Sequence, residues 1–386
     1  MRITIPTACG PQARSHRWKR VLIRLIAGLL PLAAAKNMVQ AQEPAGGKGY
    51  RVPVVALRGR ALGDPGALAK PIAIRRTGAG LVVLDRSTDD QVIVMNAETG
   101  RIARTFGRQG AGPGEFLAAQ SLDIDPKDSR VLWIYDINQR RFTRVEGALN
   151  SPPTGVPRFR SVSLNTGAAV WTPFWTSVGE IVATGFFPDK RIGVLDASGT
   201  MLRSFVDIPG NADDPAMVRQ EAYRSYLTLS PSRRRVAIAT RHSDRIDFYD
   251  VSGPRIAEGA RPFGFEPAYI VQSGGAGPAM ATGGDLRFGY IALASTERQV
   301  FALFSGRVRH GSGGTASFGT FLHVYDWRGR LEKVFSLDAP LLALTVSDDG
   351  SRVFGVRHEP LPNVMIYDVK SIEAPNTVRV PGQRLQ

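Results

Sequence analysis

One pattern recurs six times between residues 70 and 372, and it limits the fold more than any other feature of the chain. A short β-rich segment ends in a polar turn, a second segment ends in Asp or Asn, and a loop leads into the next copy. The clearest second segments end at Asn96, Asp196, Asp250, Asp326 and Asp368. A repeat of about 40–50 residues cannot bury both of its faces alone, whereas radial stacking of such four-stranded units buries them in a β-propeller.

The repeats predict an all-β protein, a single six-bladed β-propeller with four antiparallel strands in each blade, over residues 50–380. The six units cover residues 70–107, 117–147, 168–208, 222–262, 286–337 and 339–380. A seventh blade in the weakly patterned stretch 262–290 is the alternative. Residues 50–57 alternate like a strand, and we expect this strand to pair with the last blade and close the ring. Residues 381–386 are expected to form a C-terminal tail.

The first 41 residues have the composition of a secretory signal peptide. They hold seven basic side chains and no acidic one, and a basic segment precedes an apolar run over residues 25–35. Small-residue cleavage patterns follow, and the second ends at Ala41. The run is shorter than the about 20 apolar residues that span a bilayer. We therefore expect cleavage near Ala41, a linker over residues 42–49, and an extracytoplasmic protein, periplasmic or secreted, with membrane attachment only if the segment stays uncleaved.

Removing this leader changes the charge and the thiol content of the chain. Without its seven basic residues, the formal net charge falls from +15 to +8. The single cysteine, Cys9, lies in the leader, so the mature chain would have no disulfide and no thiolate nucleophile or ligand. The basic residues form no long run, and nucleic acid is therefore not an expected partner. We expect a monomer.

The sequence offers few residues for catalysis or metal binding. No Gly-x-Ser-x-Gly motif of a hydrolase occurs, and the histidines after the leader form no His-x-His or His-Glu-x-x-His pair. The acidic pairs at Asp213-Asp214 and Asp348-Asp349 lack the Asp-x-Asp-x-Asp spacing of a calcium loop. We predict no cofactor. Calcium held by isolated Asp and Asn residues from different blades is the alternative.

Arginine and histidine recur where the second strand of a blade is expected to end. In a propeller, the loops after these strands open on the same face as the connections between blades. Arginines gathered there can bind an anionic group through planar, bidentate hydrogen bonds, and their charges should lower the pKa of neighbouring histidines. The predicted ligand-binding residues are Arg86, Arg241, His242, Arg307, Arg357 and His358. The alternative is that these side chains tie neighbouring blades together.

Aromatic residues at the start of the third unit form a rival site. Trp171, Phe174 and Trp175 lie in the segment Trp171-Thr-Pro-Phe-Trp175, where the chain enters an innermost strand. Such rings can stack on a sugar or on a hydrophobic peptide. Packing between blades is the other role open to them.

The segment Phe106-Gly-Arg-Gln-Gly-Ala-Gly-Pro-Gly-Glu-Phe116 resembles the inter-blade signature of NHL-repeat propellers. Its glycines allow a sharp turn between blades, and its proline fixes one φ angle. We expect the carboxylate to cap backbone N–H groups and the last phenylalanine to wedge between blades. The residues of this structural motif are Gly110, Gly112, Pro113, Gly114, Glu115 and Phe116.

Residues 321–330 and 347–354 resemble blade hairpins of bacterial TolB-like six-bladed propellers. The resemblance implies an exported protein that binds a protein, a glycan or a small-molecule ligand, which can be anionic, on one face without enzymatic activity. A minority of six-bladed propellers are calcium-dependent lactonases, so a calcium-dependent hydrolase or lactonase is the alternative. A channel with three or four carboxylates or amides around an ion-sized gap would favour the enzyme. An apolar or arginine-lined channel would favour binding.

Overall fold

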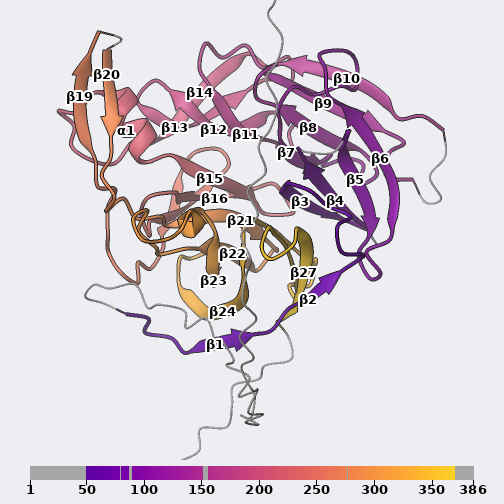
Figure 1. Ribbon diagram of the computed structural model, residues 1–386. Coiled ribbons are helices and arrows are strands. Elements are labelled where there is room, and N and C mark those ends of the chain that lie inside the picture. Colours follow the sequence, from indigo (N-terminus) through magenta and orange to yellow (C-terminus); the bar gives the residue numbers. More distant parts are fainter. Residues whose placement is uncertain (1–48, 79, 87–88, 151–154, 276, 370–386) are drawn as a thin grey trace, which may run out of the picture. The chain divides into compact units, whose positions relative to one another are not determined.

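The computed structural model of the chain describes residues 49–78, 80–86, 89–150, 155–275 and 277–369. The predicted signal peptide, the linker before residue 49 and the C-terminal tail lie outside the described residues. Six blades of antiparallel strands surround a central channel (Figure 1), which confirms the predicted six-bladed propeller.

The first three blades follow one another along the chain. Blade 1 consists of β3 (Pro71–Thr77), β4 (Gly80–Asp85), β5 (Asp90–Asn96) and β6 (Ile102–Arg108). Blade 2 consists of β7 (Ala119–Ile124), β8 (Leu132–Asp136), β9 (Arg141–Glu146) and β10 (Arg158–Ser163). Blade 3 consists of β11 (Val170–Trp175), β12 (Ile181–Phe187), β13 (Lys190–Leu195) and β14 (Met201–Asp207).

The last three blades complete the ring. Blade 4 consists of β15 (Ser225–Leu229), β16 (Arg235–Thr240), β17 (Ile246–Asp250) and β18 (Arg255–Glu258). Blade 5 consists of β21 (Tyr290–Ser295), β22 (Gln299–Phe304), β23 (Gly319–Asp326) and β24 (Leu331–Leu341). Blade 6 consists of β25 (Ala343–Val346), β26 (Arg352–Arg357) and β27 (Asn363–Asp368).

The N-terminal segment closes the ring in two steps. Strand β1 (Val54–Leu57) runs parallel to β24 and adds a fifth strand to blade 5. Strand β2 (Arg60–Leu62) then pairs antiparallel with β27 and supplies the outer strand of blade 6. The prediction that residues 50–57 pair with the last blade is therefore wrong, because the closing strand is β2. Closure covers the edge of β27 that would otherwise be free to pair with another chain.

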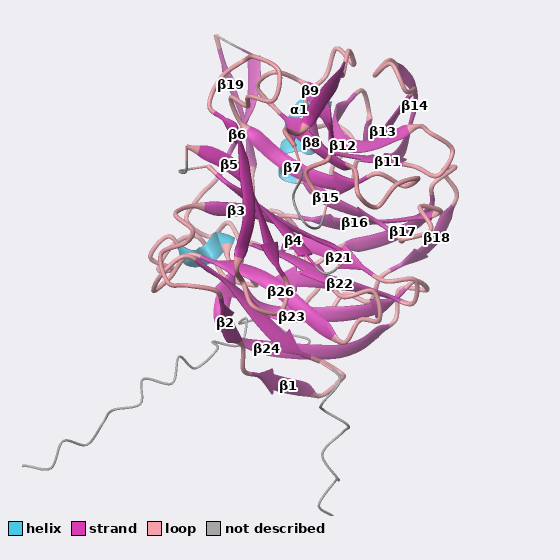
Figure 2. Ribbon diagram, turned by 90° about the vertical axis from the view of Figure 1, so that its right-hand side faces the viewer, coloured by secondary structure: helices cyan, strands magenta, loops and turns pink. Residues whose placement is uncertain are grey.

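Helical structure is sparse among the described residues, as the side view in Figure 2 shows. It consists of α1 (Ala216–Ala222) and a 3₁₀ turn over Thr315–Ser317. No helix in this part of the chain has the length and apolar character needed to cross a membrane. The stretch 262–290 holds a two-stranded hairpin, β19 (Ile270–Gly274) and β20 (Gly277–Ala281), beside α1. The seven-bladed alternative is therefore wrong.

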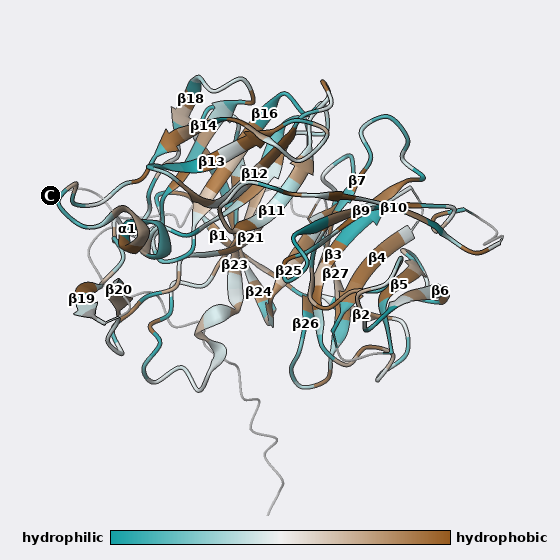
Figure 3. Cartoon of the chain, turned by 90° about the horizontal axis from the view of Figure 1, so that it is seen from above, coloured by the Kyte–Doolittle hydropathy of each residue, from teal (hydrophilic) through white to brown (hydrophobic). Residues whose placement is uncertain are grey.

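The hydrophobic core lies between adjacent blades. In β4, Leu81 and Val83 pack toward blade 6, while Val82 and Leu84 pack toward blade 2. All four side chains are fully buried, because both faces of a blade are covered by neighbours. Strands of this kind are continuous apolar runs rather than alternating ones, and Figure 3 shows them as brown segments within the blades.

Candidate ligand-binding site

The loops after the second strands and the connections between blades lie at one end of the channel, which we name the loop face. In blade 2, the first residue of β7, Ala119, pairs with the last residue of β8, Asp136. In blade 4, Ser225 pairs with Thr240 in the same way. Each inner strand therefore starts where the second strand ends, and the residues predicted for ligand binding lie at this end of their blades.

A cavity of about 280 Å³ lies in the channel and is lined by residues of all six innermost strands. The lining residues come mainly from the first half of each strand, so this channel cavity lies in the half nearest the loop face. Most of the wall is aliphatic. Its polar side chains are Arg75, Arg86, Gln120, Ser121, Thr172 and Tyr226. The lining residues include no carboxylate, so the channel is of the apolar, arginine-lined kind.

A buried ion pair lies beyond the channel cavity, toward the opposite end of the inner strands. Asp123 of β7 is fully buried and accepts two hydrogen bonds from the guanidinium of Arg233, at 2.8 and 3.0 Å. It also accepts one from the backbone N–H of Trp175 in blade 3, at 2.9 Å. Arg75 of blade 1 approaches the same carboxylate at 3.7 Å. Four blades therefore meet at this one carboxylate.

The two arginines of the channel cavity have different partners. The guanidinium of Arg75 lies 5.0 Å from the centroid of the Phe174 ring, and burial lowers its pKa although Asp123 opposes the shift. Arg86 donates to the carbonyl of Ala119 at 3.1 Å and to the side chain of Gln120 at 2.6 Å. Burial also lowers the pKa of Arg86. Among the described residues, Arg86 donates hydrogen bonds to neutral acceptors, and the charge of Asp136 partly opposes the lowering of its pKa. The shorter contacts of Asp123 are with Arg233.

A second cationic group, which we name the arginine pair, consists of Arg224 and Arg241 at the loop-face end of blade 4. The backbone N–H of Arg241 donates to the carbonyl of Arg224 at 2.8 Å. The guanidinium of Arg224 stacks on the ring of Trp171 at 3.3 Å, and that of Arg241 lies 5.4 Å from the ring centroid of Phe288. Aromatic rings, rather than carboxylates, thus hold both guanidinium groups in place.

The charges around the arginine pair are unbalanced. Burial lowers the pKa of Arg224, and repulsion from Arg241 lowers it further. The nearest carboxylate in an ion pair with either residue is Glu221, whose oxygen lies 3.9 Å from Arg224. Among the residues that the structure describes, neither arginine has another ion pair. Two neighbouring guanidinium groups with one distant carboxylate leave a net positive charge at this point of the loop face.

His242 lies next to the arginine pair and is almost fully buried. Burial lowers its pKa to about 3, and the charges of Arg241, Arg309 and Arg224 add to this effect. Its ring packs against Phe288 at 5.0 Å. His242 is therefore neutral near pH 7 and contributes no charge.

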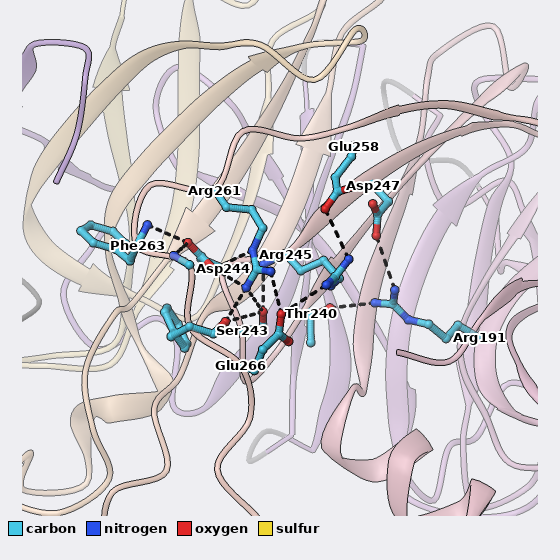
Figure 4. Close-up of polar contacts among 12 residues, drawn as sticks. Arg191, Thr240, Ser243, Asp244, Arg245, Asp247, Glu258, Arg261, Phe263 and Glu266 are labelled. Atoms are coloured by element: carbon cyan, nitrogen blue, oxygen red, sulfur yellow. Dashed lines mark hydrogen bonds and ion pairs between the residues drawn. The ribbon is translucent and has the colours of Figure 1, made fainter. Parts of the chain in front are cut away.

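A network of ion pairs fixes the loop that carries Arg241 and His242 (Figure 4). Asp244, which is fully buried, accepts hydrogen bonds from Arg261 at 2.9 and 3.0 Å and from the backbone N–H of Phe263 at 2.8 Å. Arg245 forms ion pairs with Glu258 and Glu266. These contacts tie the loop after β16, which carries Arg241, to β18 and the segment that follows it.

The other predicted ligand-binding residues lie apart from the arginine pair. Arg307 donates to the hydroxyls of Thr315 and Thr320, at 3.0 and 3.3 Å, within its own loop region. His358 donates from Nε2 to the carbonyl of Pro71 at 2.7 Å and so links blade 6 to blade 1. Arg357 has a buried Nε without a hydrogen-bond partner among the described residues. Of the six predicted residues, only Arg86 lines the channel cavity.

The three aromatic residues of β11 lie in three different environments. Trp171 is half-buried on the loop face, where its ring carries Arg224. Phe174 is buried and lines the channel cavity beside Arg75. Trp175 is buried between blades 2 and 3, with its ring 4.8 Å from that of Trp133. Trp175 is therefore a core residue, whereas the other two contact the two cationic groups.

The inter-blade motif builds the turn from blade 1 into blade 2. The carboxylate of Glu115 accepts a hydrogen bond from the backbone N–H of Gly112 at 2.9 Å. Phe116 is fully buried in the core between the two blades. Gly114 has φ +76°, and a Cβ there would lie 2.6 Å from the ring of Phe159, so only glycine fits. These contacts are structural.

Among the described residues, no group of three or more His, Cys, Asp or Glu side chains is placed to hold a metal ion. Two fully buried carboxylates, Asp123 and Asp244, are each paired with an arginine. A carboxylate already neutralised by a bidentate guanidinium is a poor ligand for calcium.

Sequence reasoning missed Arg75, Arg224 and the Asp123–Arg233 pair. Arg75 stands in the inner-strand segment Pro71-Ile-Ala-Ile-Arg75, where a charge in an apolar run marks the position as unusual. Arg224 directly precedes an inner strand, whereas the predicted positions lie at the ends of second strands. Nothing local pairs Asp123 with Arg233, since the two come from different blades.

Together the blades, their closure and the loop face define a six-bladed β-propeller. The sequence model of a protein family described as "TolB-like 6-blade propeller-like" matches residues 60–349, more than half of the chain. The chain therefore belongs to the TolB-like six-bladed propeller family. No curated protein matches it.

Two solved structures are similar in fold. One is a protein from Bacteroides fragilis NCTC 9343 that is described as exported, with 13% identity and a TM-score of 0.54. The match covers 83% of this chain and 97% of that protein. The other is U3-55K, with 12% identity and a TM-score of 0.50, covering 84% of this chain and 100% of its own. At such identities the likeness shows the fold alone.

Proposed function

We propose that this protein is an extracytoplasmic binding propeller, without enzymatic activity, that holds an anionic group of a protein, glycan or small-molecule ligand on its loop face. The observation that carries the proposal is the arginine pair. Arg224 and Arg241 are joined by a backbone hydrogen bond, and each guanidinium lies over an aromatic ring, with one carboxylate 3.9 Å from Arg224.

The chemistry of the pair fits an oxyanion with two or three oxygens. Stacking on Trp171 covers one face of the Arg224 guanidinium and leaves its N–H edge for hydrogen bonds. Like charges at short range destabilise the folded protein, and a bound carboxylate, sulfate or phosphate would remove this repulsion through charge-assisted hydrogen bonds. Because the ring of His242 is neutral, it adds no third positive charge beside the pair and no further repulsion.

The extracytoplasmic location rests on the composition of the leader, with its basic segment, apolar run and small-residue cleavage patterns. The structurally similar protein from Bacteroides fragilis is also described as exported. Mass spectrometry of the protein recovered outside the cytoplasm should find an N-terminus close to Gln42. A full-length form restricted to the cytoplasm would contradict this location.

Calorimetric titration with sulfate, phosphate and D-glucuronate tests the arginine pair. Arg241→Gln and Arg224→Gln should each weaken binding of the best anion about 10- to 100-fold, the loss of one charge-assisted hydrogen-bond donor. Arg101→Gln, at an exposed position of blade 1, is the matched control and should leave binding unchanged. Equal affinities of all four proteins, or the absence of saturable binding, would refute the proposal.

A further inference from the structure

The channel cavity is a second place where this chain is built for a ligand. It differs from the arginine pair because it is enclosed by six strands rather than lying on a rim, and neither Arg224 nor Arg241 lines it. We propose that the channel cavity binds a small molecule with one carboxylate on an apolar body. The two sites use different residues, so this inference stands independently of the anion site on the rim.

The charge in the cavity favours an anion. Arg75 and Arg86 line it, no lining residue is acidic, and both guanidinium groups come from blade 1. The nearby carboxylate of Asp123 has short, bidentate contacts with Arg233 and a contact of 3.7 Å with Arg75. Two arginines and one aspartate leave a surplus positive charge, and it lies on the side of Arg75, which faces the cavity. A buried charge of this kind is costly unless an opposite charge approaches it.

One part of the cavity wall favours an apolar body. It is formed by side chains of blades 4, 5 and 6, with Leu227, Ile291, Leu293, Leu342 and Leu344 as its aliphatic members. A molecule with a charged end and an apolar end can therefore satisfy both walls at once. A purely polar anion would leave the aliphatic wall uncovered, and an uncharged apolar molecule would leave the surplus positive charge beside the cavity uncompensated.

The dimensions set the size of this ligand. A cavity of about 280 Å³ lies just below the usual range of roughly 300–1,000 Å³ for ligand pockets. It holds about nine groups of the size of a water molecule, each of which takes about 30 Å³. A carboxylate with a chain of seven or so carbons fits this volume. The Asp123–Arg233 pair lies beyond the cavity, so the ligand enters from the loop face.

Titration with octanoate, 1-octanol and acetate tests the proposal. Octanoate should bind in a saturable way, and 1-octanol, which lacks the charge, and acetate, which lacks the chain, should each bind at least about tenfold more weakly. Arg86→Gln should weaken octanoate at least about tenfold and leave 1-octanol unchanged. Arg241→Gln, the rim variant, should leave octanoate binding unchanged.

A second variant tests the cavity without touching its charge. Ala292 lines the cavity and is half-buried, so Ala292→Phe should fill the space and abolish octanoate binding while anion binding at the arginine pair persists. Three results overturn the inference: no saturable octanoate binding, equal binding of octanoate and 1-octanol, or octanoate binding that survives Ala292→Phe in a folded protein. Loss of octanoate binding in Arg241→Gln would move the site to the rim and overturn it as well.

Discussion

The carboxylate of Asp123 in blade 2 contacts residues of blades 1, 3 and 4, so one substitution there removes contacts among four blades. Asp123→Asn keeps the size of the side chain but removes its charge and replaces one acceptor oxygen with a donor. Arg233 then loses its bidentate partner, and its guanidinium is only 13% exposed. Removing one member of a buried ion pair costs about 3–5 kcal/mol, because the remaining charge is left without compensation.

Thermal unfolding measures this loss. For a large domain, each kcal/mol lowers Tm by about 2 °C, so Asp123→Asn should lower Tm by about 6–10 °C. The matched control is Glu98→Gln, which breaks another ion pair between blades, Arg352–Glu98 at 2.6 Å. Glu98 is 60% exposed, and an exposed pair contributes about 0–1 kcal/mol, so its Tm should fall by no more than about 2 °C.

The double variant Asp123→Asn/Arg233→Gln separates the pair from its surroundings. If the two residues stabilise the propeller through each other, the double variant should be clearly more stable than the sum of the single effects predicts. A Tm for Asp123→Asn that lies within the range of Glu98→Gln would refute the reasoning, since it would mean that the buried charge of Arg233 needs no partner.

Three further outcomes are expected. Burial lowers the pKa of His323 to about 3, whereas an unfolded histidine has a pKa of about 6.5, so the unfolded state alone takes up this proton as the pH falls between these values. His323→Gln should therefore reduce the loss of unfolding free energy by up to about 1.4 kcal/mol per pH unit in urea titrations below pH 6.5. Gly289→Ala places a Cβ 1.8 Å from the carbonyl of Ser243 and should lower Tm markedly, whereas Gly275→Ala meets no atom within 4 Å and should not. A chain that starts at residue 64 lacks β1 and β2 and should aggregate in size-exclusion chromatography, while a chain that starts at residue 49 should elute as a monomer; equal behaviour of the two chains would contradict the role of β2 in closure.

The blades could be predicted because both faces of their second strands are buried. Segments such as Leu81-Val-Val-Leu84 stand out as short apolar runs, and Asp326 or Asp368 marks the end of a third strand. The closing strand β2 was missed because three residues, Arg60 to Leu62, carry no periodicity. Strand β2 meets its partner β27 only when all six blades form the ring, and this geometry cannot be derived from the local sequence.

The candidate site was only partly predictable. The pattern at the ends of second strands led to Arg241 and His242, whose neighbours include Arg224. The support of Arg224 by Trp171 joins two blades, and no local pattern records such a contact. Arg307 and His358 come from comparable strand ends of other blades but hydrogen-bond within the protein, Arg307 to Thr315 and Thr320 and His358 to the carbonyl of Pro71.

Ring closure by β2 affects the order in which the blades can fold during synthesis. Arg60 of β2 pairs with Ile366 of β27, so β2 cannot pair until β27 has been synthesised. Five blades can form while the chain is still growing, since the four antiparallel strands of each are consecutive in the chain, but blade 6 lacks its outer strand until β2 pairs with β27. Contacts between distant parts of a sequence slow folding, because the long loop between them must first be closed. Ring closure should therefore be the slow, final step of folding, and until it occurs the edge of β27 is exposed to other copies of the chain.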